Sequence, residues 1–553
     1  MGRGPQGENL VQDSGSAADG RRAEGPGGPE SGAAPAGAPS GLLSAWHRLV
    51  SFGGRESGGA WAGPSTWSAA LAGLGLDLAL TLLALGLGWS AGASHVLGFL
   101  SGVLAAGVLR RRMSLSGPRP GRVEPATLPG IGWCLVLLVS ALGLRGGIFA
   151  TGLVAGLPGW LAVAAGIGLS WGVLAGGGAL HHWVSTPPVP PPAWRWDLLS
   201  VGILVGLLLL HLVYVRVLPV MPEEAYYWNY AIRPALGYLD HPPMVAWLIG
   251  LSEAAFGHGR ASLRLPGLLC GALLVAFLYR FADRLVDRPA ALVAAALAAV
   301  LPYPFFAAGL MMTPDAPLAA AWAASLYFLH RALIGGERRA WYGAGIALGL
   351  GMLSKYTILT LGLGALAFGV LERRARGWFL RPEPYAAVLI ALLLFSPVIY
   401  WNWANDWASF RFQSGGRFGE ETQFSLHLML LNMLLVATPL PLLALALLFS
   451  RRWSREPGRA PDPPQAELRN RLFVGCAVLV PLAIFGWSAL SHPPRLNWTG
   501  PIWLATLPLL GWALVRADVL AWGTLGKALR LSAAPVLGSL LALYAAFSFY
   551  AVL

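Results

Sequence analysis

The stretch 198-LLSVGILVGLLLLHLVYVRV-217 is apolar except for a Ser, a His and an Arg. Its twenty residues match the length that an α-helix needs to cross the hydrocarbon core of a bilayer. Similar apolar runs recur along nearly all of the 553 residues. The composition is 56% hydrophobic but only 12% charged, which is about half the charged fraction of an average soluble protein. The sequence therefore predicts an all-α fold and a polytopic membrane protein.

The apolar runs divide the chain into four parts. Residues 1–67 are rich in Gly, Ala, Pro and Ser, without an apolar periodicity, and are expected to be a disordered tail without a signal peptide. Spans are predicted within 68–185 and within 196–553, and the Pro-rich segment 186–195 is expected to be a stiff linker between them. Counting every run long enough to span a bilayer predicts about fifteen transmembrane helices.

Basic residues in the loops of 196–553 set the expected orientation. With a cytoplasmic N-terminus, the inward loops hold nineteen Lys and Arg residues and the outward loops hold seven. This asymmetry fits the positive-inside rule, so 221-MPEEAYYWNY-230 is expected to lie on the extracytoplasmic face of the cell (inner or plasma) membrane. The net charge of +13 follows from this topology and does not predict nucleic-acid binding.

The outward loops hold most of the distinctive polar and aromatic residues. Seven blocks stand out, in the order 223-EEAYYW-228, 237-GYLDHPPMVAWL-248, 264-RLPGLL-269, 313-TPDAPL-318, 349-GLGMLSKYT-357, 398-VIYWNWANDWASFRFQ-413 and 492-HPPRLNWTGPIW-503. Together they resemble the dolichyl-phosphate-mannose protein mannosyltransferase superfamily, and most of all its bacterial branch of aminoarabinose transferases. The resemblance implies a GT-C fold and a polyprenyl-phosphate sugar donor. It also implies transfer of a hexosyl or pentosyl group to a lipid, glycan or protein acceptor on the outer face.

The residue types also suit this chemistry without reference to the family. A sugar leaving a lipid phosphate needs a base for the acceptor hydroxyl and positive charge for the departing phosphate. The alternative is a flippase or transporter of polyprenyl-phosphate sugars. Transporters more often place ionisable residues near mid-membrane, between internal repeats, whereas here these residues gather at outward span ends. The sequence therefore favours an enzyme.

Two adjacent glutamates are the candidates for catalysis. The resemblance implies that Glu223, the first carboxylate of the pair, deprotonates the acceptor, although relatives usually carry Asp at this position. Glu224 is expected to support Glu223 or to hold a divalent cation, and the sequence leaves the metal requirement open. The alternative for both residues is a solvated pair in a loop.

Further candidates contact the donor phosphate or the substrate. The resemblance places Asp240, with His241 beside it, near the phosphate or a metal, and it places Lys355 near the lipid phosphate. Lys355 is one of only two lysines among 39 basic residues, and its ammonium group is a compact phosphate contact. The remaining candidates are Arg264, Asp315, Arg495, Asn497 and Trp498. Asp315 is also expected to cap a helix, because it lies at a span end.

Residues 68–185 form two apolar hairpins. Their order resembles the GtrA-like family of four-span proteins, mainly through 145-RGGIFATGLVAGLPGWLAVAAGIGLSW-171, and this resemblance implies translocation of polyprenyl-linked sugars. Asp77 lies inside the first predicted span, where a carboxylate costs about 2.5–3.5 kcal/mol on insertion scales. It is therefore expected to pair with Arg145 or to face a polar path, and the alternative is a role in helix packing.

Overall fold

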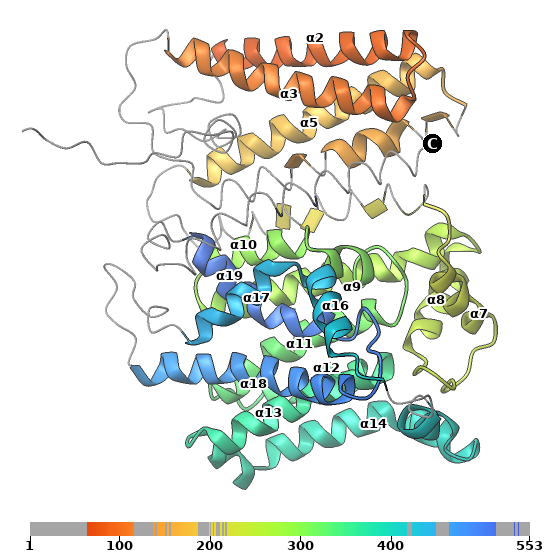
Figure 1. The fold of residues 1–553 in the computed structure, drawn as a ribbon, viewed down its shortest axis with the longest axis vertical. Helices are drawn as coiled ribbons and strands as arrows, with labels where there is room; N and C mark the ends of the chain where they lie inside the picture. Colours follow the sequence, from red (N-terminus) through yellow and green to blue (C-terminus); the bar gives the residue numbers. More distant parts are fainter. Residues whose placement is uncertain are drawn as a thin grey trace, which may run out of the picture. The chain divides into compact units, whose positions relative to one another are not determined.

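In the computed structural model, the described residues are 64–115, 218–416, 423–449 and 464–515, most of 137–185, and scattered positions between 198 and 215 and at 536 and 540. Regular secondary structure in these residues is helical throughout (Figure 1). The linker and nearly all of the tail lie outside the described residues, as do most of the spans predicted at 198–217 and beyond 530.

The described helices confirm the predicted all-α membrane protein. By length and composition, six of them can cross a bilayer: Ser68–Gly86, Ala91–Leu109, Gly159–Gly177, Arg260–Leu285, Pro382–Ala404 and Glu467–Ala489. A seventh candidate span, Leu426–Ala437 with Pro439–Phe449, is bent by 102°. The bend lies at Thr438, whose φ of +61° is rare for a non-glycine residue, directly before Pro439.

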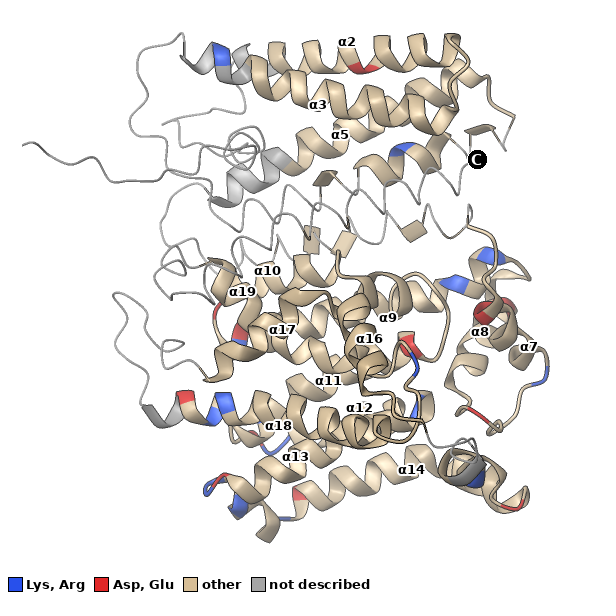
Figure 2. Ribbon diagram, viewed as in Figure 1, with Lys and Arg blue, Asp and Glu red and all other residues tan. Residues whose placement is uncertain are grey.

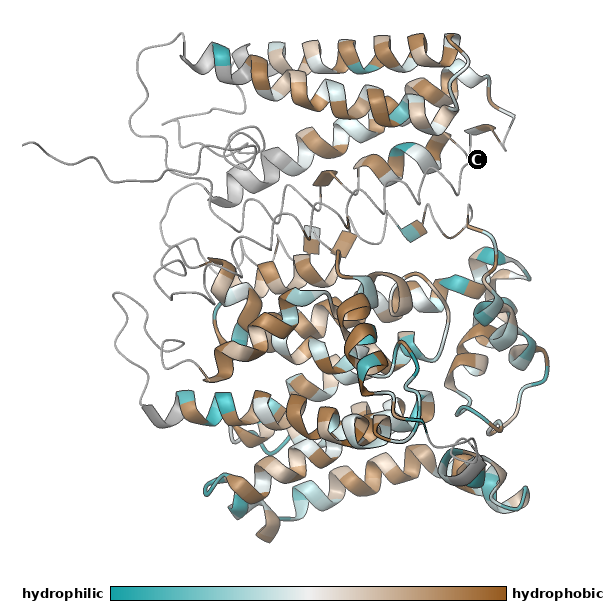
Figure 3. Ribbon diagram, viewed as in Figure 1, coloured by the Kyte–Doolittle hydropathy of each residue, from teal (hydrophilic) through white to brown (hydrophobic). Residues whose placement is uncertain are grey.

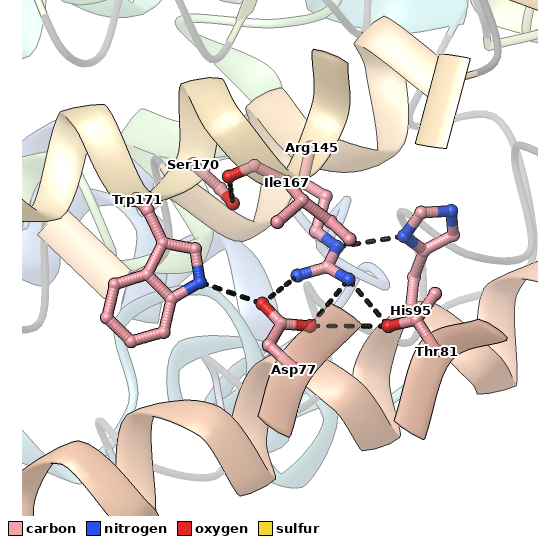
Figure 4. A network of polar contacts seen from close by, with 7 residues as sticks. All are labelled: Asp77, Thr81, His95, Arg145, Ile167, Ser170 and Trp171. Carbon is pink, nitrogen blue, oxygen red and sulfur yellow. Dashed lines mark hydrogen bonds and ion pairs between the residues drawn. The ribbon is translucent and has the colours of Figure 1, made fainter. Parts of the chain in front are cut away.

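The N-terminal helices are α2 (Pro64–Gly86), α3 (Ala91–Leu115) and α5 (Gly159–Ser185). Helices α2 and α3 approach closely at Gly73 and Gly102, where a Cβ atom added to either glycine would lie 2.6 Å from the carbonyl oxygen of the other. Small residues permit such close packing in membranes. The expected pairing of Asp77 with Arg145 is confirmed, with Arg145 Nη1 2.6 Å from Asp77 Oδ2 (Figure 4).

Residues 218–515 contain most of the remaining helices. They are α7 (Pro222–Ile232), α8 (Met244–Phe256), α9 (Arg260–Leu285), α10 (Arg288–Ala298), α11 (Asp315–Leu333), α12 (Ala340–Ser354), α13 (Leu359–Leu371), α14 (Pro382–Ala404), α15 (Ala408–Arg411), α16 (Leu426–Ala437), α17 (Pro439–Ala446), α18 (Pro464–Ala489) and α19 (Leu507–Val515). Helix α11 packs between α9 and α12, α12 packs on α14, and α13 packs on α18. One continuous apolar core joins these six helices. Helices α7 and α8 pack in a second, smaller apolar cluster with residues of α9 and α11.

Two breaks in the helices position polar side chains inside this bundle. The chain between α10 and α11 is irregular apart from the π-helix η1 (Tyr303–Ala307), and it is largely buried. Helix α12 ends at Ser354, and Lys355 is extended before the short 3-10 helix η2 (Tyr356–Ile358). Irregular backbone at membrane depth is tolerated where protein surrounds it, because its polar groups can find partners there.

The charged residues of 218–515 gather at the two ends of these helices, and the stretches between are mostly apolar (Figures 2 and 3). At one end, Arg284 pairs with Glu337 at 2.9 Å and Arg469 pairs with Glu372 at 3.3 Å, so the arginine-rich loops lie together. The other end holds the start of α9 and α11 and the end of α12. This separation agrees with the two sets of loops that the charge count distinguishes.

Candidate functional site

A buried ion pair fixes the start of α7. Arg264, on α9, donates from Nε to Glu224 Oε1 at 2.8 Å and from Nη2 to Oε2 at 2.5 Å, and both side chains are buried. Arg264 also donates to the backbone carbonyls of Val215, Leu218 and Pro219. These bonds use all five N–H donors of the guanidinium group. A phosphate contact by Arg264 would therefore require one of them to break.

The two glutamates of 221-MPEEAYYWNY-230 have opposite environments. Pro222 begins α7, which suits a residue without an N–H, and the two acidic residues that follow occupy the positive end of the helix dipole. Glu224 points inward and accepts from the backbone N–H of Met221 at 3.1 Å and of Met312 at 3.3 Å. Glu223 is exposed. One carboxylate of the pair is therefore open to solvent, and the other is bound inside the fold.

A second polar cluster surrounds Asp315 at the start of α11. Lys355 Nζ donates to both carboxylate oxygens at 3.1 and 3.2 Å, and Asn497 Nδ2 donates to Oδ2 at 2.5 Å. Tyr303 donates to Oδ1 at 3.5 Å. The structure thus brings together three of the residues that the sequence predicts for the site.

Helix capping by Asp315, expected from its position at a span end, is not observed. The N-cap residue of α11 is Pro314, and the backbone N–H of Asp315 donates to Thr313 Oγ1 at 3.4 Å. Asp315 is instead the first residue of the helix, where the dipole favours a negative charge. Its carboxylate oxygens accept hydrogen bonds from Lys355, Asn497 and Tyr303. The position of Asp315 at the helix start is therefore explained by its hydrogen bonds to these side chains rather than by N-capping.

The segment 311–315 connects the two clusters. Its Met312 N–H donates to Glu224 Oε1, and three residues later Asp315 accepts from Lys355. Hydrogen bonds between buried groups therefore join the first turn of α7 and the start of α9 to both helix breaks, the one between α10 and α11 and the one at Lys355. Buried polar groups that are hydrogen-bonded to one another in this way hold a rigid geometry.

A third cluster lies at Asp240, in the loop between α7 and α8. Tyr226 and Tyr230, one turn apart on α7, both donate to its carboxylate, the former at 3.2 Å. The Nδ1 atom of His241 lies 3.4 Å from Oδ2, without good hydrogen-bond geometry. Burial alone raises the pKa of Asp240, but the adjacent His241 and the two tyrosines outweigh it and lower the pKa to about 2. Asp240 is therefore ionised at neutral pH.

Later segments close over this loop. Gln413 Nε2 donates to the Asp240 carbonyl at 2.6 Å, and the indole of Trp401, on α14, covers Gly237, where an added Cβ atom would meet the ring at 2.9 Å. The hydroxyl of Tyr356, next to Lys355, shares a hydrogen bond with Ser409 Oγ at 2.9 Å. The block 398–413 thus reaches both the Asp240 loop and the break at Lys355.

The other predicted residues lie at the edge of this arrangement. Arg495 is exposed, and Trp498 is half-buried with its ring 5.8 Å from that of Phe485. In the part of the chain that the structure describes, no three His, Cys, Asp or Glu side chains converge as a metal site requires. The carboxylates of Glu224 and Asp240 are engaged by Arg264 and by tyrosines, so the residues present give no support for the predicted cation site.

Sequence reasoning missed three tyrosines that shape the site. Tyr226 and Tyr230 hold Asp240, and Tyr303 reaches Asp315 from the π-helix. The spacing of Tyr226 and Tyr230 was a usable signal, because residues four apart share one face of a helix. No such signal existed for Tyr303, because its position depends on an irregular turn inside the bundle.

Comparison with known proteins supports this picture for the central part of the chain. Residues 240–401 match the family model described as dolichyl-phosphate-mannose-protein mannosyltransferase, which confirms the predicted resemblance over the part that contains Asp240, Arg264, Asp315 and Lys355. No curated protein matches the chain.

Several solved structures are similar to the chain, including these three. Apo ArnT from Cupriavidus metallidurans has 21% identity and a TM-score of 0.47, and the match covers 60% of this chain and 62% of that one. The same protein bound to undecaprenyl phosphate has 20% identity, a TM-score of 0.48 and coverage of 65% and 70%. The apo Archaeoglobus fulgidus oligosaccharyltransferase has 15% identity, a TM-score of 0.40 and coverage of 65% and 56%. The chain thus spans less than two thirds of the length of the first of these structures.

Proposed function

We propose that the chain is an integral membrane glycosyltransferase of the GT-C type. It transfers a sugar from a polyprenyl-phosphate donor to a lipid, glycan or protein acceptor on the outer face of the membrane. One observation carries the proposal. The exposed Glu223 lies on the helix turn that also holds Glu224, and Glu224 is bonded to Arg264 and to the segment 311–315. The same segment ends at Asp315, which binds Lys355. A base and a cation are thereby held in one rigid frame.

In this proposal Glu223 is the general base. Its carboxylate takes the proton of the acceptor hydroxyl as the oxygen attacks the anomeric carbon, and the polyprenyl phosphate leaves from the opposite face with inversion. Exposure of Glu223 suits this role, because the acceptor must reach it. Proton transfer by a positioned base typically contributes about 10²- to 10⁴-fold to a rate.

Lys355 holds the departing phosphate in the same proposal. Its ammonium group has three N–H donors, and Asp315 accepts two of them. The third has no acceptor in the described part of the chain and can donate to a phosphate oxygen that approaches from the outer end of the bundle. Asn497 and Tyr303 fix Asp315, so the ammonium group is positioned before the donor binds.

An apolar cavity supports a lipid-linked donor. It has a volume of about 540 Å³ and is lined by side chains of α11 to α14, among them Met352 and Ile358, which lie three residues before and after Lys355. Nearly all of its wall is apolar. An isoprenoid chain whose phosphate is bound at Lys355 would find such a lining beside its first units.

The proposal is tested by release of polyprenyl phosphate from a radiolabelled polyprenyl-phosphate sugar, incubated with purified protein and bacterial membranes. We expect Glu223→Gln to reduce release at least 100-fold, as loss of a general base should. Asp406→Asn is the matched control, because Asp406 is an exposed carboxylate in the turn between α14 and α15 and is expected to be dispensable. Parent-like release by Glu223→Gln would eliminate Glu223 as the base.

A rival reading, a flippase or transporter without transferase activity, predicts a different result. The labelled sugar would then stay attached to its polyprenyl phosphate in every variant, and only its side of the membrane would change. For residues 68–185, translocation of the donor stays a prediction from the GtrA-like resemblance. Activity of residues 196–553 alone, in cells without other flippases, would remove the basis for coupling the two parts.

A further inference from the structure

The centre of the N-terminal helices contains a buried polar network outside the site described above. Arg145 donates to Asp77 at 2.6 and 2.8 Å, to Thr81 Oγ1 at 2.9 Å and to His95 Nδ1 at 2.8 Å (Figure 4). Trp171 Nε1, on α5, donates to Asp77 Oδ2 at 2.8 Å. One guanidinium group therefore ties α2, α3 and the helical residues 141–149 together, and Asp77 adds α5.

The network fixes the protonation of His95. Arginine is always protonated and its Nε atom only donates, so His95 Nδ1 must accept and must carry no proton. The single ring proton then lies on Nε2, which is buried and has no partner among the described residues. The His95 side chain, 1% exposed, is thus neutral in this conformation and leaves a buried donor unsatisfied.

A proton and Arg145 compete for the same atom. A proton bound at Nδ1 would point at the Arg145 Nε–H and would place a second positive charge beside the guanidinium group. The charged groups that face His95 are Arg145 and Asp77, and Asp77 is already engaged by Arg145, Thr81 and Trp171. On its other side the imidazole packs against Phe149, with ring centroids 4.6 Å apart, which offers no acceptor.

We propose that His95 is a proton-sensitive contact between α3 and residues 141–149. Uptake of a proton at Nδ1 breaks the hydrogen bond from Arg145 and moves α3 away from residues 141–149. Arg145 stays bound to Asp77, so residues 141–149 remain attached to α2. Helices α2 and α3 stay together, because they pack through Gly73 and Gly102 rather than through His95. The device gives this membrane bundle two arrangements whose populations depend on pH.

Distances between spin labels test the proposal in the full-length protein in liposomes, with the three native cysteines replaced by alanine. The labels occupy Leu100→Cys on α3 and Leu153→Cys beyond residues 141–149, both exposed positions. At about pH 8 we expect one narrow distance, and at about pH 4, far enough below the usual histidine pKa to overcome the neighbouring Arg145 charge, a second and longer one. A control pair at Leu71 and Leu104 reports α2 against α3 and should not change.

His95→Asn separates this mechanism from a general effect of acid. The Asn side chain can place an acceptor where Nδ1 lies but cannot take up a proton, so one distance is expected at both pH values. If its distance at high pH differs from the parent's, His95→Gln replaces it. An unchanged distance in the parent, or the same lengthening in the neutral variant, would overturn the proposal. A change in the control pair would also overturn it, because the bundle would then be unfolding.

Discussion

Two neighbouring carboxylates in α7 show how much depends on the direction of a single side chain. Glu223 and Glu224 have the same chemistry and adjacent positions, but successive residues of a helix point about 100° apart. Glu224 therefore reaches buried Arg264 while Glu223 faces outward. The sequence predicted the pair as a site, but it could not show which member meets Arg264, because that contact joins residues 40 positions apart.

Replacing Glu224 with Gln should destabilise the fold rather than act on chemistry alone. The amide keeps the shape but removes the charge, so Arg264 is left buried without its counter-ion, and losing one partner of such a pair costs about 3–5 kcal/mol. Thermal or denaturant unfolding of the purified protein measures this loss. Glu223→Gln is the matched control and should unfold like the parent. Equal stability of the two variants would contradict the structural role of Glu224.

Asp240 should contribute to stability with a definite pH dependence. Its pKa is lowered from 3.8 to about 2 in the folded protein, so its favourable contacts are fully present above the unfolded value and are lost as the pH falls toward 2. The difference in stability between the parent and Asp240→Asn should therefore be present at about pH 5 and should shrink below about pH 4. Unfolding curves across this range measure it. A difference that stays the same from about pH 5 down to about pH 3 would mean that these contacts do not favour the ionised form of Asp240.

Among the elements, the breaks in the helices matter more to the site than the helices do. Apolar runs and family blocks placed Asp315 and Lys355 at span ends, and this much was predictable. The contact between them was not, because it depends on the irregular chain between α10 and α11 and on the extended backbone at Lys355. Tyr303 belongs to the same irregular chain. Neither apolar periodicity nor capping rules describe backbone of this kind.

Gly500 tests the coupling between two of these irregular elements. It begins the 3-10 helix η6 (Gly500–Thr506), and an added Cβ atom would lie 2.2 Å from Cδ2 of the Tyr303 ring. Gly500→Ala should therefore push Tyr303 away from Asp315 and cost about 1–3 kcal/mol of stability, as overpacking does. The resistance to unfolding and the rate of sugar transfer should both be lower than in the parent. Gly475→Ala, on α18, is the control: its added Cβ atom meets no atom within 4 Å, so it should behave like the parent. Equal stability and activity of the two variants would show that η6 can shift to accommodate the methyl group without cost.

Across the whole of 218–515, the polar residues divide between the two ends of the helices. The arginine-rich loops are joined by Arg284 with Glu337 and by Arg469 with Glu372. The candidate site lies where α9 and α11 begin and α12 ends. Loop charges could predict this division because each spanning helix carries the chain to the opposite end, so that successive loops alternate between the two ends. The loop charges could not predict which polar side chains at the same end of the bundle are in contact with one another.

The orientation of these two ends in the membrane is the last prediction. If the arginine-rich end is cytoplasmic, as the positive-inside rule requires, then the loop at Asp406 and the candidate site face outward. Asp406→Cys should then react with a membrane-impermeant maleimide in right-side-out vesicles. Gly377→Cys, exposed in the 3-10 helix η3 (Ala375–Leu380), should react only after the membrane is made permeable. Both sites are exposed, so a difference in labelling reports the side of the membrane rather than burial. The reverse pattern would place Glu223 in the cytoplasm, where an acceptor on the outer face could not reach it.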